Sequence, residues 1–105
     1  METTVNGIKL WYDSQGKGEP LVVTGGFALA HYQFEIVTPH LANHCNVINW
    51  DYEGTGFADR TIPQSQTVDH WVEQLRGLLD TMGIRKTSLW GTANGALIVL
   101  LFAAR

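Results

Sequence analysis

The chain has 105 residues, which is enough for one domain and hardly enough for two. Hydrophobic residues make up 45% and charged residues 16%, so the composition is that of a globular domain and excludes a disordered segment. The formal net charge is −3, and the seven Lys and Arg residues are scattered. This distribution excludes the basic surface expected of a nucleic-acid-binding protein.

No membrane segment is expected either. Residues 1–5 hold neither a basic segment nor an apolar run, so they do not resemble a signal peptide. The longest apolar run, residues 95–104, is about half of the ~20 residues that a membrane span needs. Cys45 is the single cysteine, which excludes an internal disulfide and favours a reducing compartment. We therefore expect a soluble cytoplasmic protein that does not bind a membrane.

The N-terminal residues predict a β-hairpin. Asn6-Gly7 separates two short strand candidates, residues 3–5 and 8–12. This dipeptide favours the tight two-residue turn, because both central positions of that turn have positive φ.

The next segments predict two buried strands with a helix between them. Residues 21–23 and 46–50 are short apolar runs of the kind found in strands covered on both faces. Residues 32–43 predict the intervening helix, and Pro39 predicts a break or a late start within it.

The C-terminal part predicts helix, strand and helix. Apolar residues recur at helical spacing over residues 68–82, with Thr67 as the N-cap and Gly83 at the position after the helix. Residues 87–90 predict a strand. The helix expected from residue 96 onward is apolar all round, which predicts that it is buried on every side.

This alternation of strands and helices predicts an α/β fold. Parallel strands joined by helices form a sheet that is covered on both faces. We expect a three-layer sandwich whose sheet is mainly parallel and carries the antiparallel N-terminal hairpin.

The turn between the last strand and the last helix carries the most specific motif. Gly91-Thr92-Ala93-Asn94-Gly95 has the spacing of the Gly-x-Ser-x-Gly nucleophile elbow, with Ala93 at the central position. Gly91 and Gly95 are the small residues that let strand and helix approach each other. A helix-packing turn in an unrelated α/β protein would need the same glycines, so the motif alone leaves both interpretations open.

Two further motifs occur in the order expected of one family. Residues 21–27 are similar to a third strand followed by a His-Gly oxyanion loop, with Gly25 at the His position. Residues 50–58 are similar to an Asp-x-Arg-Gly-x-Gly-x-Ser turn, with Glu53 in place of Arg and Ala58 in place of Ser. Together with the hairpin and the elbow, they make the chain resemble the N-terminal half of the α/β-hydrolase family.

The resemblance covers residues 1–105, which correspond to strands 1–5 through the elbow helix. It implies an oxyanion hole formed by the backbone N–H groups of Phe27 and Asn94, next to a nucleophile position at Ala93. It also implies a parent activity on a carboxylic ester or lactone. Alanine cannot form a covalent intermediate, so the chain is predicted to be inactive as written.

The acid and the histidine of this family follow the nucleophile in the chain, and neither occurs after Ala93. The histidines that precede it are His31, His40, His44 and His70. A pseudo-hydrolase that binds a small molecule without turnover, and a fragment without independent activity, are the alternative functions.

Other candidate sites are weaker. His31 follows the oxyanion loop and Trp90 precedes the elbow, so both are candidates for substrate contact. A simpler interpretation places His31 at the surface or at the start of a helix. The simpler interpretation of Trp90 is a position in the core. The segment after residue 24 lacks the glycines of a dinucleotide loop. His40 and His44 have helical spacing but no convincing further ligand beside Cys45. We expect no metal and no cofactor.

The apolar helix from residue 96 also predicts how the isolated chain behaves. If the chain stands alone, one side of this helix is uncovered, so a complementary C-terminal half or a second copy of the chain is expected to cover it. Light scattering should therefore detect oligomers or aggregates. A stable monomer with a cooperative melting transition would contradict this prediction.

Overall fold

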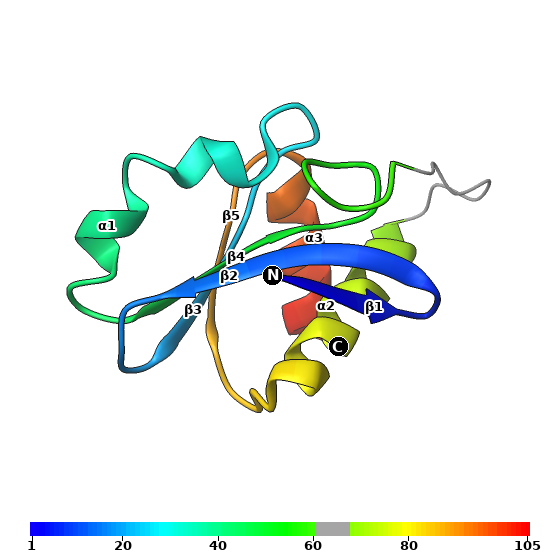
Figure 1. Cartoon of the computed structure of the whole chain (residues 1–105). Coiled ribbons are helices and arrows are strands. Elements are labelled where there is room, and N and C mark those ends of the chain that lie inside the picture. Colours follow the sequence, from blue (N-terminus) through cyan, green and yellow to red (C-terminus); the bar gives the residue numbers. More distant parts are fainter. Residues whose placement is uncertain (61–67) are drawn as a thin grey trace.

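The computed structural model describes residues 1–60 and 68–105 (Figure 1). The predicted N-cap Thr67 lies outside these described residues. The strands are β1 (Glu2–Val5), β2 (Ile8–Gln15), β3 (Pro20–Thr24), β4 (Asn46–Asp51) and β5 (Ser88–Gly91). The helices are the 3₁₀ helix η1 (Ala30–Phe34) and the α-helices α1 (Thr38–Leu41), α2 (Val68–Met82) and α3 (Asn94–Ala104).

The strands form one mixed sheet in the order β1-β2-β4-β3-β5. Strand β3 lies between β4 and β5 and is parallel to both, whereas β2 is antiparallel to β4 and to β1. The turn from β1 to β2 contains Asn6 and Gly7, both with positive φ as the dipeptide predicted. Because β3, β4 and β5 are parallel, their carboxyl ends meet at one edge of the sheet.

Helices cover both faces of the sheet, which gives the three layers expected from the sequence. Helices α2 and α3 pack on one face around a core that includes Leu75, Leu78 and Ile98, all fully buried. The short helices η1 and α1 lie on the other face, where Phe34 packs with Val23 of the sheet (Figure 1). The α/β architecture predicted from the alternating pattern is confirmed.

The segment predicted as a helix over residues 32–43 is helical only in part, and the break or late start expected at Pro39 is confirmed. The chain instead forms η1, leaves it at Phe34, and begins α1 at Thr38, with Pro39 in the first turn of α1. Proline has no N–H and fits only the start of a helix, which explains the late start. Thr38 Oγ1 donates a hydrogen bond to the Phe34 carbonyl at 2.7 Å and so links the two short helices.

Helix α3 is not buried on every side in the described chain, so that expectation is also wrong. Ile98 and Val99 face the core, but Leu97 is 48% and Leu100 is 67% exposed. The helix contacts β3, β5 and α2, which cover only one of its sides. None of the described helices is long and apolar enough to cross a bilayer.

The structure predicts that Gly95→Ala destabilises the fold. A Cβ at residue 95 would lie 2.1 Å from the Thr24 carbonyl oxygen, and backbone cannot move aside as a side chain can. We expect a loss of about 3 kcal/mol in the free energy of unfolding, measured by urea titration.

Gly77→Ala is the matched control, because it adds the same methyl group to a helix. The three atoms nearest to its Cβ would be side-chain atoms of Val5, with Cγ1 at 2.3 Å, and these can shift more readily than backbone. The gain in helix propensity, about 1 kcal/mol, offsets part of that strain. Equal destabilisation by the two substitutions would contradict the close approach described for Gly95.

Candidate active site

A sharp corner joins β5 to α3, and Ala93 stands at its apex. Ala93 has φ 52° and ψ −124°, a conformation that residues with a side chain rarely adopt. Such backbone strain is typical of functional positions and is of the order of 1–3 kcal/mol. The Thr92 N–H donates to the Thr24 carbonyl at 3.1 Å, so the corner is fixed to the end of β3. The Ala93 side chain is exposed.

The glycines on either side of Ala93 are required by close packing. A Cβ on Gly91 would lie 2.4 Å from the Gly95 carbonyl oxygen, and a Cβ on Gly95 would lie 2.1 Å from that of Thr24. No larger residue fits at either position without moving backbone. The Gly91 and Gly95 spacing therefore reflects contact between strand and helix.

The loop that follows β3 adjoins the corner. A Cβ on Gly26 would lie 3.2 Å from the Ala93 Cβ, so these two residues are in van der Waals contact. Among the described residues, neither the backbone N–H of Phe27 nor that of Asn94 has a hydrogen-bond acceptor. Both donors therefore remain available for a ligand. Their role as oxyanion donors stays a prediction.

Gly25, at the position where the family has histidine, has no room for a side chain. A Cβ there would lie 2.2 Å from the Ala30 carbonyl oxygen. Ala30 itself has φ 50°, and its N–H closes the loop by donating to the Gly26 carbonyl at 2.9 Å. The loop thus follows a tight path that suits glycine at residue 25.

The buried phenol of Tyr52 connects the three segments that surround the corner. Its hydroxyl donates to the Gly25 carbonyl at 2.9 Å and accepts from the Asn94 side-chain amide at 3.2 Å. Burial raises the pKa of Tyr52, the Asp51 carboxylate adds to the rise, and the Asn94 hydrogen bond opposes it. The phenol therefore stays protonated at neutral pH and holds the ends of β3, β4 and α3 together.

Asp51 fastens two loops at the end of β4. Its carboxylate accepts hydrogen bonds from the backbone N–H of His31 at 2.9 Å and of Phe57 at 3.0 Å. His31 Nδ1 lies 2.5 Å from the same carboxylate, and its ring packs between Trp11 and Tyr32. These contacts give Asp51 the structural role of holding its turn. They place His31 in a buried packing position, so substrate contact by His31 stays a prediction.

Glu53, which replaces the arginine of the family motif, is buried against α2. Its carboxylate lies 2.5 Å from His70 Nε2 and accepts from the Gln74 amide at 3.2 Å. Gln74 also accepts from the Glu53 N–H, and Trp71 Nε1 donates to the Glu53 carbonyl. No sequence motif predicted this cluster. The one feature that could have indicated it is Gln74, a polar residue beside the apolar stripe of α2. A polar side chain that is buried at such a position needs a hydrogen-bond partner.

Trp90 lies away from the corner's apex. Its ring packs on Phe34 at a centroid distance of 5.2 Å and is 40% exposed, so it lies on the sheet face that carries η1 and α1. Its role in substrate binding stays a prediction. The Thr92 hydroxyl is buried and has no partner among the described residues, so it cannot reach a substrate from this position.

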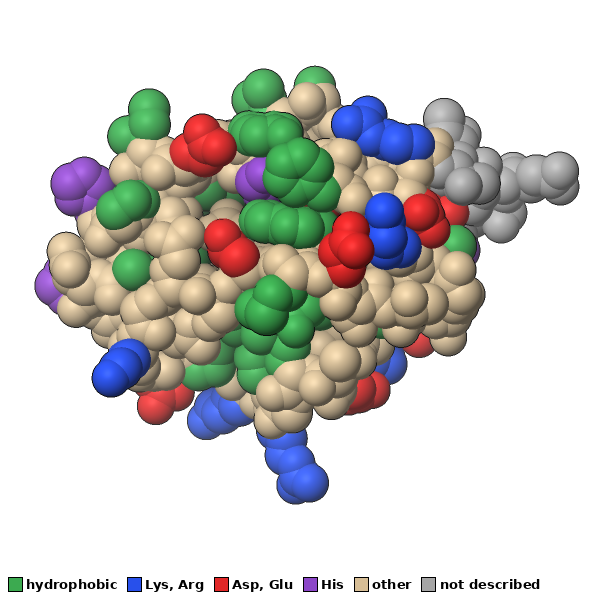
Figure 2. Space-filling model, viewed as in Figure 1, with side chains coloured by type: hydrophobic (Ala, Val, Ile, Leu, Met, Phe, Trp, Pro, Cys, Tyr) green, Lys and Arg blue, Asp and Glu red, His purple; other side chains and the backbone are tan. Residues whose placement is uncertain are grey.

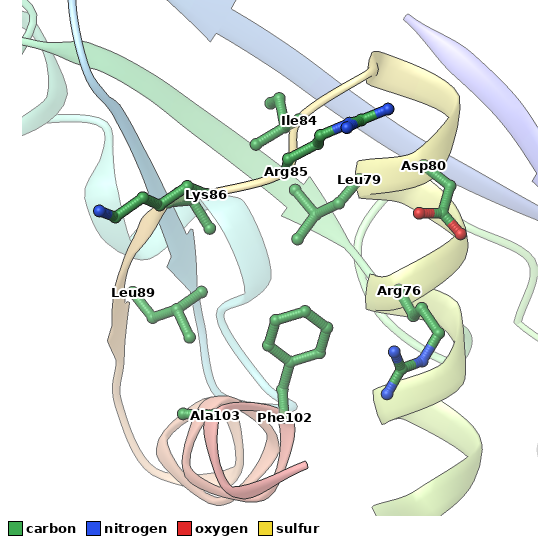
Figure 3. Close-up of a pocket in the computed structure, with 10 residues that line it drawn as sticks. Arg76, Leu79, Asp80, Ile84, Arg85, Lys86, Leu89, Phe102 and Ala103 are labelled. Atoms are coloured by element: carbon green, nitrogen blue, oxygen red, sulfur yellow. The ribbon is translucent and has the colours of Figure 1, made fainter.

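A cavity lies elsewhere in the molecule, away from Ala93. It has a volume of about 540 Å³ and lies between α2, β5 and α3, where Leu79, Leu89 and Phe102 face one another (Figure 3). Arg76, Arg85 and Lys86 surround it. Ala93 does not line this cavity, so the cavity is separate from the corner. Within the described ranges, no cluster of three or more His, Cys, Asp or Glu residues could hold a metal ion.

Comparison with known proteins identifies the family. Residues 19–105 match the family described as alpha/beta hydrolase fold. The chain belongs to this family. The strand-to-helix corner and the adjoining glycine loop therefore lie in an α/β-hydrolase fold.

The similar proteins include curated and structurally characterised hydrolases. The chain is 32% identical to 2-hydroxy-6-oxo-2,4-heptadienoate hydrolase from Pseudomonas putida, over 94% of this chain and 37% of that protein. It is 27% identical to soluble epoxide hydrolase from Corynebacterium, over 97% of this chain and 35% of that protein. A meta-cleavage product hydrolase from Pseudomonas fluorescens, solved as an alanine mutant with acetates, superimposes with a TM-score of 0.89 at 26% identity, over 98% of this chain and 39% of that one. The chain thus spans less than two fifths of the length of these relatives.

The Tyr52 hydroxyl predicts a measurable stability effect. Tyr52→Phe leaves the Gly25 carbonyl and the Asn94 amide without their partner, so we expect a loss of about 1–3 kcal/mol in the free energy of unfolding. Urea titration of Tyr52→Phe and of Tyr32→Phe, which changes an exposed tyrosine, measures the difference. Equal stability of the two variants would contradict the connecting role of Tyr52.

The raised pKa of Tyr52 also predicts how stability depends on pH. Above pH 10 the Tyr52 phenol loses its proton in the unfolded chain but keeps it in the folded chain. Unfolding therefore releases a proton, and a rising pH favours unfolding. When the pH is raised from 9 to 11, which spans the ordinary tyrosine pKa of ~10, the free energy of unfolding should therefore fall less for Tyr52→Phe than for the original chain. Parallel pH profiles would contradict a shifted pKa.

Proposed function

We propose that this chain forms the nucleophile-bearing part of an α/β-hydrolase domain and that Ala93 occupies the nucleophile position. The observation that carries the proposal is the backbone of Ala93, which has positive φ at a strand-to-helix corner in contact with the loop after β3. An exposed side chain at such an apex faces a bound molecule. A methyl group in that place has no lone pair, so the chain does not catalyse nucleophilic hydrolysis as written.

The proposed reaction of the parent enzyme is hydrolysis of a carboxylic ester or lactone. Attack at the carbonyl carbon moves negative charge onto its oxygen, which the N–H groups of Phe27 and Asn94 would stabilise. Each such donor contributes about 3–4 kcal/mol to lowering the barrier. Both donors are backbone groups, so they do not depend on the identity of residue 93. This pocket would take a small molecule with a polarised carbonyl group.

The general base and its acid partner are proposed to come from outside this chain. His31 is held by Asp51 and His70 by Glu53, while His40 and His44 are exposed at α1 and the segment after it. No described histidine is therefore placed to take a proton at Ala93. Residues that complete the domain, or a partner that covers α3, would supply both groups.

A second function is favoured by the same observation. The corner and its free N–H donors are independent of a reactive side chain, so the site can bind a carbonyl compound without turnover. The chain would then act as a small-molecule binding module.

Ala93→Ser tests the first function. In the longest available reading frame that contains this chain, the variant should hydrolyse 4-nitrophenyl acetate, whereas the Ala93 form should not. Loss of a triad serine lowers kcat by about six orders of magnitude in a well-studied serine protease, so a restored hydroxyl should produce a comparably large gain.

Ala96→Ser is the matched control, because it adds the same hydroxyl one helical turn into α3. It should remain inactive. Turnover by the Ala93 form, or equal activity of the two serine variants, would contradict the assignment. Saturable binding of the ester without turnover in Ala93→Ser would favour the binding module.

A further inference from the structure

A second cavity lies on the opposite face of the sheet from α2 and α3. It has a volume of about 240 Å³ and lies between β2, β4 and α1. Its lining includes Trp11 and Asp13 of β2, Asn49 of β4, Thr38 of α1, Glu35 and His31. Neither Ala93 nor the N–H donors beside it belong to this cavity, whereas His31, a predicted substrate-contact residue, lines it.

Asn49 presents a hydrogen-bond acceptor to this cavity. The residue is 5% exposed, and its amide nitrogen donates to Thr38 Oγ1 at 3.2 Å. Thr38 uses its single hydrogen on the Phe34 carbonyl and can only accept from Asn49. This chain of hydrogen bonds fixes the orientation of the amide. Asn49 Oδ1 is buried and has no donor among the described residues.

Asp13 supplies a second acceptor beside the first. It pairs directly with Asn49 across the antiparallel strands β2 and β4, which places the two side chains next to each other on one face. Asp13 Oδ2 accepts from the Gln15 amide at 3.3 Å, while Oδ1 is buried without a donor in the described parts of the chain. A buried acceptor without a donor destabilises the fold, so two adjacent ones point to a ligand that donates to both.

The other walls favour a positively charged donor. Two carboxylates line the cavity, that of Asp13 and that of the exposed Glu35. Neither forms an ion pair with a described Lys or Arg. Trp11 contributes an indole ring, which attracts cations through its face. Figure 2 shows hydrophobic side chains gathered around a histidine on the viewed face, with acidic side chains beside them. The described ranges contain no set of three residues suited to a metal ion, which favours an organic cation.

We propose that this cavity binds the primary ammonium group of a small organic amine. An ammonium group carries three N–H donors, so one group can donate to Asp13 Oδ1 and Asn49 Oδ1 together. The short carbon chain of the amine then lies along the Trp11 ring. A quaternary ammonium ion lacks N–H donors, and a neutral alcohol lacks the charge, so neither replaces it.

Calorimetric titration of the chain with n-butylammonium chloride tests the proposal. We expect saturable binding, accompanied in NMR spectra by a shift of the Asn49 side-chain amide signals. Tetramethylammonium chloride and 1-butanol at the same concentrations should bind at least about tenfold more weakly, since one charge-assisted hydrogen bond contributes about 1.5–3 kcal/mol. Absence of saturation, as expected if water serves both oxygens, would overturn the proposal. Equal binding of tetramethylammonium would overturn it as well.

Asp13→Asn separates this cavity from nonspecific attraction to the acidic protein. The variant should bind butylammonium about tenfold more weakly. Asp80→Asn removes a carboxylate that lines the other cavity and should leave binding unchanged. If Asp13→Asn does not fold, Asn49→Leu, which removes the other acceptor, is used in its place to test the loss of binding. Unchanged affinity in a folded variant of either cavity residue would overturn the assignment.

Discussion

The close approach of α3 to the end of β3 is the constraint on which the corner depends. Gly95 packs directly on the carbonyl of Thr24, and Gly91 packs on Gly95. With strand and helix so close, the two residues between β5 and α3 must reverse the chain sharply, and Ala93 takes the positive φ that this requires. The strain at residue 93 is thus a consequence of packing, and it turns the side chain of residue 93 outward next to Gly26.

The loops around the corner are fixed by buried polar groups of the segment after β4. Tyr52 bonds to the β3 loop and to Asn94, Asp51 bonds to the N–H groups of His31 and Phe57, and Glu53 bonds to α2. Each group has its hydrogen-bond partners, so these contacts stabilise the path of the loops.

Local patterns in the sequence predicted much of the fold. The helix over residues 68–82 and the Asn6-Gly7 hairpin depend on short-range periodicity and turn chemistry, and both are confirmed. The partners of Tyr52 and Glu53 lie far along the chain, so no local pattern revealed them. Over residues 32–43 the late start at Pro39 was predicted correctly, but the separate helix η1 was not, because it depends on the packing of Phe34 on the sheet. The prediction that α3 is buried on every side was wrong for the described chain. The hydrophobicity of a helix indicates which of its side chains can be buried, whereas the neighbouring elements determine which of them are covered.

The central claim is that the corner presents the side chain of residue 93 to a bound carbonyl group. A cysteine at this position tests it most directly, because a thiol reacts without a neighbouring base. In a Cys45→Ser background, the acylation rate of Ala93→Cys by 4-nitrophenyl acetate is compared with that of Thr92→Cys by mass spectrometry. We expect residue 93 to be acylated much faster, since the Thr92 side-chain oxygen is buried. Acylation at residue 93 that is no faster than at residue 92 would contradict the claim.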